Sequence, residues 1–344
     1  MSTFIRYGFA CLFAIFTSQL CAQDIHLSHI HASPIVLNPA MTGLFTGKTR
    51  LIGNAKSQWN SITNGYRTAV GSIDTKLWEF RNADMIGGGL QIASDHAGDL
   101  DFTTTSIGLS FSVLKSLTGK GDNYVSFGLQ NSFISNRVDY SQIIAFSEEP
   151  SVANGASNKV RYWDLSAGLA WFYSIDRFNS FYLGGSLFHI NEPNVSFFQN
   201  GNASEGYKLF RRWVIHGGGD FKLGKKSYLK PSFIFQDQGP HREITVGSFL
   251  KYKTLKSYRS KAPSSVYFGT WLRWAVEKDF FGTDAVVVAA RIDYNKTYLT
   301  FTFDVNISSL TRVSYGRGGP EFSVVHILES KGRRQPTKVR CPDF

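Results

Sequence analysis

The most constraining feature of this sequence is the segment Tyr298–Ile307, which reads YLTFTFDVNI. Every second residue from Leu299 to Ile307 is apolar, and the residues between them are polar. A period of two places the apolar side chains on one face of an extended strand, whereas a helix would mix the two sets. About ten residues tilted by roughly 45° cross the hydrocarbon of a bilayer. The segment therefore has the length and pattern of a membrane-spanning β-strand.

The same alternation recurs from Lys48 almost to the end of the chain. It is clear where Ile107, Leu109 and Phe111 alternate with serine and glycine. We count about fourteen such segments, an even number within the range of bacterial single-chain barrels. They are expected at residues 48–59, 66–78, 85–96, 106–113, 125–133, 164–174, 180–190, 209–223, 227–236, 243–252, 266–278, 285–294, 298–307 and 321–328.

Composition supports an all-β membrane barrel. The 344 residues include 15% aromatic and only 18% charged residues, with 32 glycines. No apolar run is long enough for a transmembrane helix, which needs about 18 or more residues. We therefore predict an all-β fold, an outer-membrane β-barrel of about 14 antiparallel strands, with an N-terminal periplasmic arm and a short C-terminal tail.

The first residues are typical of a secretory signal. Arg6 is followed by the apolar stretch Phe9–Phe16, and Ala22 is a small residue before a cut at Gln23. We predict a signal peptide over residues 1–22, which implies export and an outer-membrane location. Its removal would leave Cys341 as the remaining cysteine, so we expect no internal disulfide.

Residues 23–47 are predicted to form an arm outside the strand pattern. Pro34 and Pro39 oppose both helix and strand hydrogen bonding, so the segment should be a fixed, turning element. Its apolar residues need cover, which a barrel mouth or lumen would provide. The barrel is then expected over residues 48–329 and a basic tail over residues 330–344.

The connections predict an orientation. The two longest, Asp139–Lys159 and Asn191–Gly206, follow the fifth and seventh segments and therefore open on the same rim. Outer-membrane barrels carry their longer loops outside the cell, so this rim should be extracellular. The tryptophans are expected mostly near strand ends, where aromatic girdles lie. They are Trp59, Trp78, Trp163, Trp171, Trp213, Trp271 and Trp274.

Charged residues on the polar strand faces should pair inside the lumen, because lipid would disfavour them. This predicts a packed or plugged interior rather than a wide pore. The residues concerned are Asp74, Lys76, Asp164, Asp220, Arg291, Asp293 and Asp304.

The formal net charge of +11 indicates an anionic neighbour. For an exported protein we expect lipid phosphates, peptidoglycan or an acidic protein surface, and no nucleic acid. Outer-membrane lipids are therefore among the predicted partners.

Two clusters of side chains could bind a metal ion. For each, the alternative is that the residues bind no metal. The arm carries His26, His29 and His31, but no helix or cysteine partner would fix their geometry. An outer loop carries Asp95, Asp99 and Asp101, but at spacings unlike a calcium-binding EF-hand loop. We predict no metal site at either cluster.

No catalytic motif is found. The glycine triplets Gly87–Gly89 and Gly217–Gly219 lie within predicted strands, where they serve barrel geometry rather than phosphate binding. Arg317–Gly319 is interpreted as a turn that either reaches a partner or is a plain connection between strands. We predict a protein that is not an enzyme and uses no cofactor.

Several motifs, taken together and in order, resemble one family. They are LNPAMTG at Leu37–Gly43, SQW at Ser57–Trp59, HINEPN at His189–Asn194, FDVNISSL at Phe303–Leu310, SYGRGGPEFSV at Ser314–Val324 and the closing CPDF at Cys341–Phe344. The chain is similar here to the PorP/SprF family of type IX secretion system membrane proteins. The resemblance implies a non-enzymatic outer-membrane barrel that supports secretion or surface anchoring of a large adhesin or other cargo through the cargo's C-terminal domain, linked to gliding motility. It also implies contact with periplasmic type IX machinery or a peptidoglycan-associated protein.

The aromatic connection after the seventh segment is our predicted cargo contact, because exposed aromatics are common interface anchors. The predicted partner-binding residues are Asn191, Pro193, Phe197, Phe198, Tyr207 and Arg317. The alternative function is an outer-membrane transport channel for a hydrophobic or small polar solute.

Overall fold

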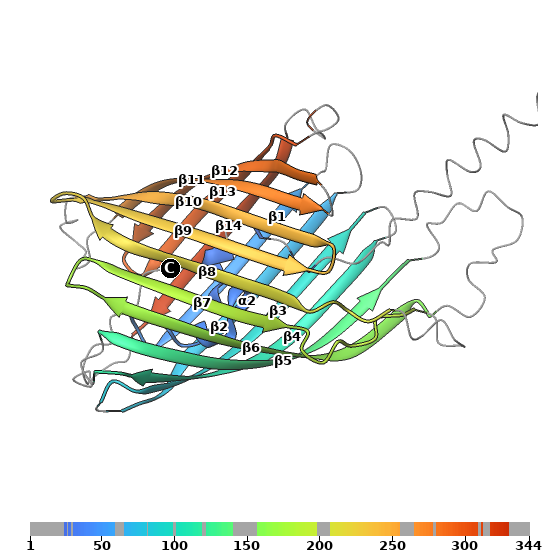
Figure 1. Ribbon diagram of the computed structural model, residues 1–344, viewed down its shortest axis with the longest axis horizontal. Helices are drawn as coiled ribbons and strands as arrows, with labels where there is room; N and C mark the ends of the chain where they lie inside the picture. The colour runs from blue at the N-terminus through green and yellow to red at the C-terminus, as the bar shows by residue number, and fades with distance from the viewer. Residues whose placement is uncertain are drawn as a thin grey trace, which may run out of the picture.

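The structure is a computed structural model, and it forms a closed antiparallel barrel (Figure 1). Each strand pairs with its neighbours in sequence, and β1 closes the circle by pairing with β14. The predicted fold class and the fourteen strands are confirmed. The structure describes residues 24–25, 27–28, 30–58, 65–80, 82–98, 101–118, 122–139, 157–197, 207–254, 265–277, 280–308, 311 and 317–329.

The strands follow the predicted segments, with ends that shift by a few residues. Their bounds are β1 Thr49–Gln58, β2 Tyr66–Glu79, β3 Met85–Ala97, β4 Phe102–Ser116, β5 Asn123–Arg137, β6 Lys159–Ser174, β7 Ser180–Phe188, β8 Arg212–Lys222, β9 Ser227–Gln238, β10 His241–Lys253, β11 Ser265–Glu277, β12 Phe280–Tyr294, β13 Thr297–Asn306 and β14 Arg317–Leu328.

Two rims result from this order. The connections after odd-numbered strands meet at one rim, which we call the long-loop rim because the β5–β6 and β7–β8 connections lie there. The connections after even-numbered strands meet at the opposite, short-turn rim. The two longest predicted loops therefore share a rim, as their order indicated.

The period of two sorts side chains between the outer face and the lumen. On β4, Leu109, Phe111 and Val113 are more than half exposed on the outer face, whereas Ser110 and Ser112 are buried. The opening segment behaves in the same way, since Leu299 and Phe301 are exposed while Thr300 and Thr302 are buried. The outer face is therefore the lipid-facing side.

The arm lies inside the barrel (Figure 1). It contains the 3-10 turn η2 Ile30–Ala32, the short helix α2 Pro34–Leu37 and the 3-10 turn η3 Pro39–Met41. Its first described residue, Asp24, contacts Arg212 at the long-loop rim, and Lys48 bonds to Leu328 at the short-turn rim. The arm thus spans the lumen from rim to rim, and the lumen provides the cover that its apolar residues were expected to need. Burial of its apolar residues requires the enclosed lumen.

Among the described residues, the predicted inward-facing charges pair except for Lys76, whose Nζ lies 5.7 Å from the ring centroid of Phe45. Arg50 and Asp74 approach to 2.8 Å, Lys230 and Asp220 to 3.4 Å, and Arg291 and Asp293 to 2.7 Å. Further pairs join Arg273 to Asp304 and His189 to Asp164. Ion pairing in the lumen satisfies charges that the lipid face would not tolerate.

One of the described tryptophans is an exception to the expected girdles, and the interpretation of Arg317–Gly319 as a turn is wrong. Trp271 is buried in the lumen against Phe249, with ring centroids 4.7 Å apart, because the alternation of β11 turns it inward and not toward the lipid interface. Arg317–Gly319 is not a turn but the start of β14, and Gly319 is buried where an added Cβ would overlap the backbone of Ser57 on β1.

Because the outer face contacts lipid, the loss of stability caused by a charged substitution there should depend on its depth in the bilayer. Leu109 lies in the middle of β4, whereas Leu223 lies in the turn after β8. We expect Leu109→Arg to lower the free energy of unfolding in lipid vesicles by about 2–4 kcal/mol, and Leu223→Arg by about 1 kcal/mol or less. Urea titrations of both variants measure this, and equal losses would contradict the assignment.

Candidate functional site

The contact between the arm and the lumen wall is the most elaborate polar arrangement among the described residues. Pro34 occupies the first turn of α2, where a missing N–H costs nothing, and Pro39 does the same for η3. Asn38 stands between them in an extended conformation, and its side chain accepts the Ala40 N–H at 2.8 Å. The two prolines and this cap fix a rigid double turn.

Asn38 also joins the arm to three strands. Its Nδ2 donates to the carbonyls of Leu169 on β6, at 3.0 Å, and Gly185 on β7, at 3.2 Å. The same nitrogen lies 3.0 Å from Nε2 of His216 on β8. Since Asn38 is completely buried, loss of these partners would leave an amide unsatisfied.

Serines of the wall satisfy the carbonyls of the arm. Ser186 donates to Leu37, Ser126 to Ala40 and Ser112 to Thr42, at 2.6–2.7 Å. Irregular backbone inside a barrel needs such partners, because each buried carbonyl without one costs free energy. The small polar residues of the inward face therefore act as a cradle for the arm.

Glycines on the wall strands allow the backbone of the arm to come close to the wall. A Cβ added to Gly128 on β5 would overlap the backbone of Pro39 and Ala40, and one added to Gly168 on β6 would overlap the Asn38 side chain. Two backbones can come this close only where the wall residue has no side chain.

Near the short-turn rim an ion pair holds the arm. Asp74 is fully buried, binds Arg50 through both of its oxygens, and accepts the Gly43 N–H at 2.7 Å. The guanidinium of Arg50 lies 4.7 Å from the ring centroid of Phe45. Gly43 has a φ of +74°, a conformation that glycine adopts without strain.

A second group of charges, the rim cluster, holds the start of the arm at the long-loop rim. It comprises Asp24, Asp164, His189 and Arg212. His189 contacts Asp24 at 2.8 Å and Asp164 at 2.9 Å, and Arg212 contacts Asp24 at 3.2 Å.

The rim cluster changes the protonation of its members. Burial disfavours the charged imidazole of His189, but the carboxylates of Asp24 and Asp164 outweigh burial and raise its pKa to about 9. Burial likewise opposes the charge of Asp24, yet His189 and Arg212 hold its pKa below the usual range. At neutral pH His189 is therefore an imidazolium between two carboxylates.

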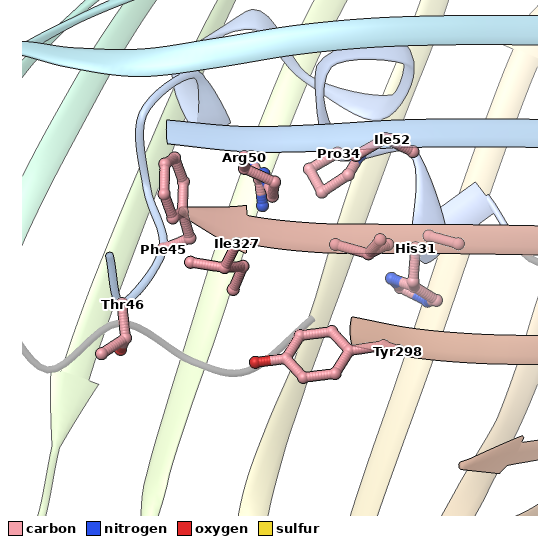
Figure 2. A pocket seen from close by; sticks show the side chains of 10 residues that line it. His31, Pro34, Phe45, Thr46, Arg50, Ile52, Tyr298 and Ile327 are labelled. Atoms are coloured by element: carbon pink, nitrogen blue, oxygen red, sulfur yellow. The ribbon is translucent and has the colours of Figure 1, made fainter. Parts of the chain in front are cut away.

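A small pocket remains between the arm and the wall made by β1, β13 and β14 (Figure 2). Figure 2 shows Phe45 and Arg50 at one end and His31 and Tyr298 at the other. His31 is buried, and its Nδ1 lies 3.4 Å from the hydroxyl of Tyr182. The described residues thus leave a crevice beside the arm.

The candidate metal ligands are not brought together, and the described residues contain no group of three His, Cys, Asp or Glu side chains that could hold a metal ion. His26, His29 and Asp99 lie outside the described residues. Asp95 accepts a hydrogen bond from Thr68, whereas Asp101 contacts His96 at 3.1 Å.

The predicted partner-binding residues have separate roles. Asn191 caps the free edge of β6, since it accepts the Leu165 N–H and donates to the Trp163 carbonyl. Pro193 is buried, and its carbonyl accepts the Leu209 N–H.

The aromatic residues among the predicted partner-binding residues differ in their surroundings. The ring of Phe197 packs edge to face on Phe102 at 6.2 Å, and Tyr207 is 53% exposed. Phe198 lies outside the described residues. The backbone of Arg317 begins β14 and pairs with Val305 on β13.

Sequence reasoning missed the residues that hold the arm, namely Asp24, Asn38, Gly128, His189 and Arg212. Asn38 and His189 lie in the family motifs LNPAMTG and HINEPN, but these motifs gave neither residue a structural role. The partners of Asn38 lie more than 130 positions away, so no local pattern could identify them.

These features define a class. No helix among the described residues is both long and apolar enough to cross a membrane. A closed antiparallel barrel with an apolar outer face and a polar, filled lumen is an outer-membrane β-barrel protein.

The comparison with known families gives the particular one. Residues 20–325 match the family described as type IX secretion system membrane protein PorP/SprF, and the chain belongs to this family. It is therefore an outer-membrane component of type IX secretion. No curated protein matches the chain.

Solved structures share the barrel only distantly. The CymD monoaromatic hydrocarbon channel is 11% identical with a TM-score of 0.47, over 88% of this chain and 94% of that one. A bacterial polysaccharide outer membrane secretin is 8% identical with a TM-score of 0.43, over 83% and 100%. CdiB from Escherichia coli is 10% identical with a TM-score of 0.44, over 80% and 62%. Similarities this low carry no argument about this chain.

The close approach at Gly128 predicts that Gly128→Ala displaces the arm. Because overpacking costs about 1–3 kcal/mol, amide exchange at Ala40, Met41 and Thr42 should become about tenfold faster or more. Hydrogen exchange with mass spectrometry measures this. Gly53→Ala is the control, since its added Cβ meets nothing within 4 Å. An unchanged arm in Gly128→Ala would contradict the packing described.

The rim cluster predicts a pH dependence. His189 has a pKa of 6.5 when free and about 9 in the folded protein, so its contribution to stability is complete below pH 6.5 and is lost as the pH rises through 9. The free energy of unfolding of the natural protein should exceed that of His189→Asn by about 1–3 kcal/mol at pH 6 and by much less at pH 10. Urea titration across this range tests it. A difference that does not change with pH would refute the assignment.

Proposed function

We propose that this protein is a non-enzymatic holder of secreted cargo at the cell surface. It would support secretion or surface anchoring of a large adhesin or other cargo by binding the cargo's C-terminal domain, in connection with gliding motility. Membership of the PorP/SprF family supports this role. The single observation that carries it here is the arm inside the lumen. A barrel filled by its own chain is suited to holding a partner protein rather than to conducting a solute.

The orientation belongs to the proposal. We place the long-loop rim outside the cell, since longer loops of such barrels are extracellular. The exposed Tyr207 and the nearby Phe197 stand at that rim and are the proposed cargo contacts. The short-turn rim, with the basic residues 330–344 beyond β14, would face periplasmic type IX machinery or a peptidoglycan-associated protein.

The alternative is an outer-membrane channel for a hydrophobic or small polar solute. The crevice between the arm and β1, β13 and β14 is the observation that favours it. Conduction would require the arm to move, which would break the bonds of Asn38 and of the serine cradle. The cargo-holding role needs no such rearrangement.

The loop assignment predicts the effect of removing two aromatics. We expect Phe197→Ala combined with Tyr207→Ala to reduce cargo recovery about tenfold or more, because aromatic anchors dominate interface energies. The measurement is affinity purification of the tagged protein from outer membranes, with quantitative mass spectrometry of a co-purifying surface protein that ends in a small β-domain.

Phe178→Ala is the matched control, because Phe178 is an exposed aromatic at the opposite rim. It should leave cargo recovery unchanged. Equal recovery with the double variant would refute the loop contact, and absence of any such cargo from the natural protein would refute the holding role.

A further inference from the structure

The outer face of the β5–β6 hairpin carries three cations close together at the long-loop rim. Register places Arg137 opposite Lys159, and Ser135 opposite Arg161. Because Lys159 and Arg161 are two residues apart on one strand, their side chains point to the same face, about 7 Å apart along it. All three cations are exposed. We call Arg137, Lys159 and Arg161 the hairpin cation cluster.

Aromatic rings lie directly below this cluster. The next outward-facing pair toward the barrel centre is Phe133 and Trp163, whose ring centroids are 5.2 Å apart. Trp163 is 62% exposed, and farther down the same face Leu129 and Leu169 are also exposed. An apolar band followed by aromatic rings and then cations is the order in which a membrane surface presents hydrocarbon, interface and headgroups.

The cations of the cluster have no carboxylate partner among the described residues, and this distinguishes them from several other surface cations. Lys115 pairs with Asp84 at 2.6 Å, Arg242 with Asp237 at 2.9 Å and Arg211 with Glu192 at 3.1 Å. No ion pair of the described chain includes a member of the hairpin cation cluster. Mutual repulsion of three cations is tolerable where an external anion neutralises them.

The cations are exposed on the outer face, although the edge of β6 is partly covered. β7 pairs with β6 only over Ala167–Ser174, and beyond it Asn191 bonds to Leu165 and Trp163 while the Ser157 N–H donates to the Phe197 carbonyl. The hydroxyl-bearing side chains of Thr105 and Ser135 lie in the same register row as Arg161 and face the same side. Two guanidinium groups and an ammonium, with hydroxyls beside them, match the recognition chemistry of a phosphate ester.

We propose that the hairpin cation cluster binds the phosphates of a lipid headgroup, specifically the phosphorylated glycolipid of the outer leaflet. The acyl chains would lie along Phe133, Trp163 and the apolar band, and the phosphates would contact Arg137, Lys159 and Arg161. The choice of leaflet rests on the proposed orientation of the long-loop rim, whereas the phosphate chemistry does not. Such a site would fix the height and rotation of the barrel in the membrane, with its loops turned to the outside.

The test is lipid retention by the purified full-length protein in detergent, measured by native mass spectrometry with bis-phosphorylated lipid A. We expect Arg137→Gln combined with Arg161→Gln to weaken retention about 30-fold, since each cation near a membrane surface contributes about fivefold. Lys225→Gln combined with Lys226→Gln removes the same charge from the opposite rim and should leave retention unchanged. Heat-dependent gel mobility confirms that each barrel is assembled.

Four results would overturn the proposal. Three of them are equal retention by the Arg137/Arg161 variant, an equal loss in the Lys225/Lys226 variant, and undiminished retention of lipid A lacking its phosphates. Displacement of lipid A by millimolar inorganic phosphate would also overturn it, because it would show a simple anion site and not a lipid site. The lipid-retention assay contains no cargo, so a negative result would not bear on the cargo-holding role. A negative result for cargo recovery would likewise not bear on lipid binding.

Discussion

Burial of the N-terminal arm in the lumen is the interaction on which the rest of this structure depends. A barrel of fourteen strands encloses more space than short side chains can fill. Along β4 to β7 the inward residues include Ser112, Ser126, Gly128 and Ser186, which leave room. The arm occupies that room, and its carbonyls bond to the same serines. Wall and arm are therefore complementary in shape and in hydrogen bonding.

The other part of the lumen is filled in a different way. On β10 to β12, Phe249, Tyr267, Trp271 and Val287 form a buried cluster of the wall's own side chains. Arg273 and Arg291 are paired with aspartates around it. Large inward residues thus fill the side that the arm does not reach. On the other side the arm fits over serines and glycines of the wall and packs against a second cluster that includes Leu114, Tyr124, Phe172 and Tyr182.

The sequence predicted the fold well because barrel strands obey a local rule. The alternation in Tyr298–Ile307 or in β4 depends only on the two faces of a strand, so it can be read from neighbouring residues. It failed where a strand has an unusual inward residue, such as Trp271, and where glycines resemble a turn, as at Gly318 and Gly319. The candidate site was much less predictable. Asn38 depends on Leu169 and Gly185, and Asp24 depends on His189 and Arg212, and these pairings arise only once the barrel closes.

A lumen closed by its own chain changes what an outer-membrane barrel can do. The surfaces left for partners are the two rims and the outer face, and the proposed cargo and lipid contacts both lie at the long-loop rim. The arm contributes rigidity to that rim, because the rim cluster ties Asp24 to β6, β8 and the end of β7. Placement of partners around a closed lumen is consistent with a holding role in type IX secretion.

Single-channel conductance in planar bilayers tests the closed lumen most directly. The natural protein should show no steady current, and a variant lacking residues 33–45 should open a steady, ohmic one, because those residues fill the lumen beside β4 to β7. A steady current through the natural protein, equal to that of the shortened variant, would contradict the central claim that the arm closes the barrel.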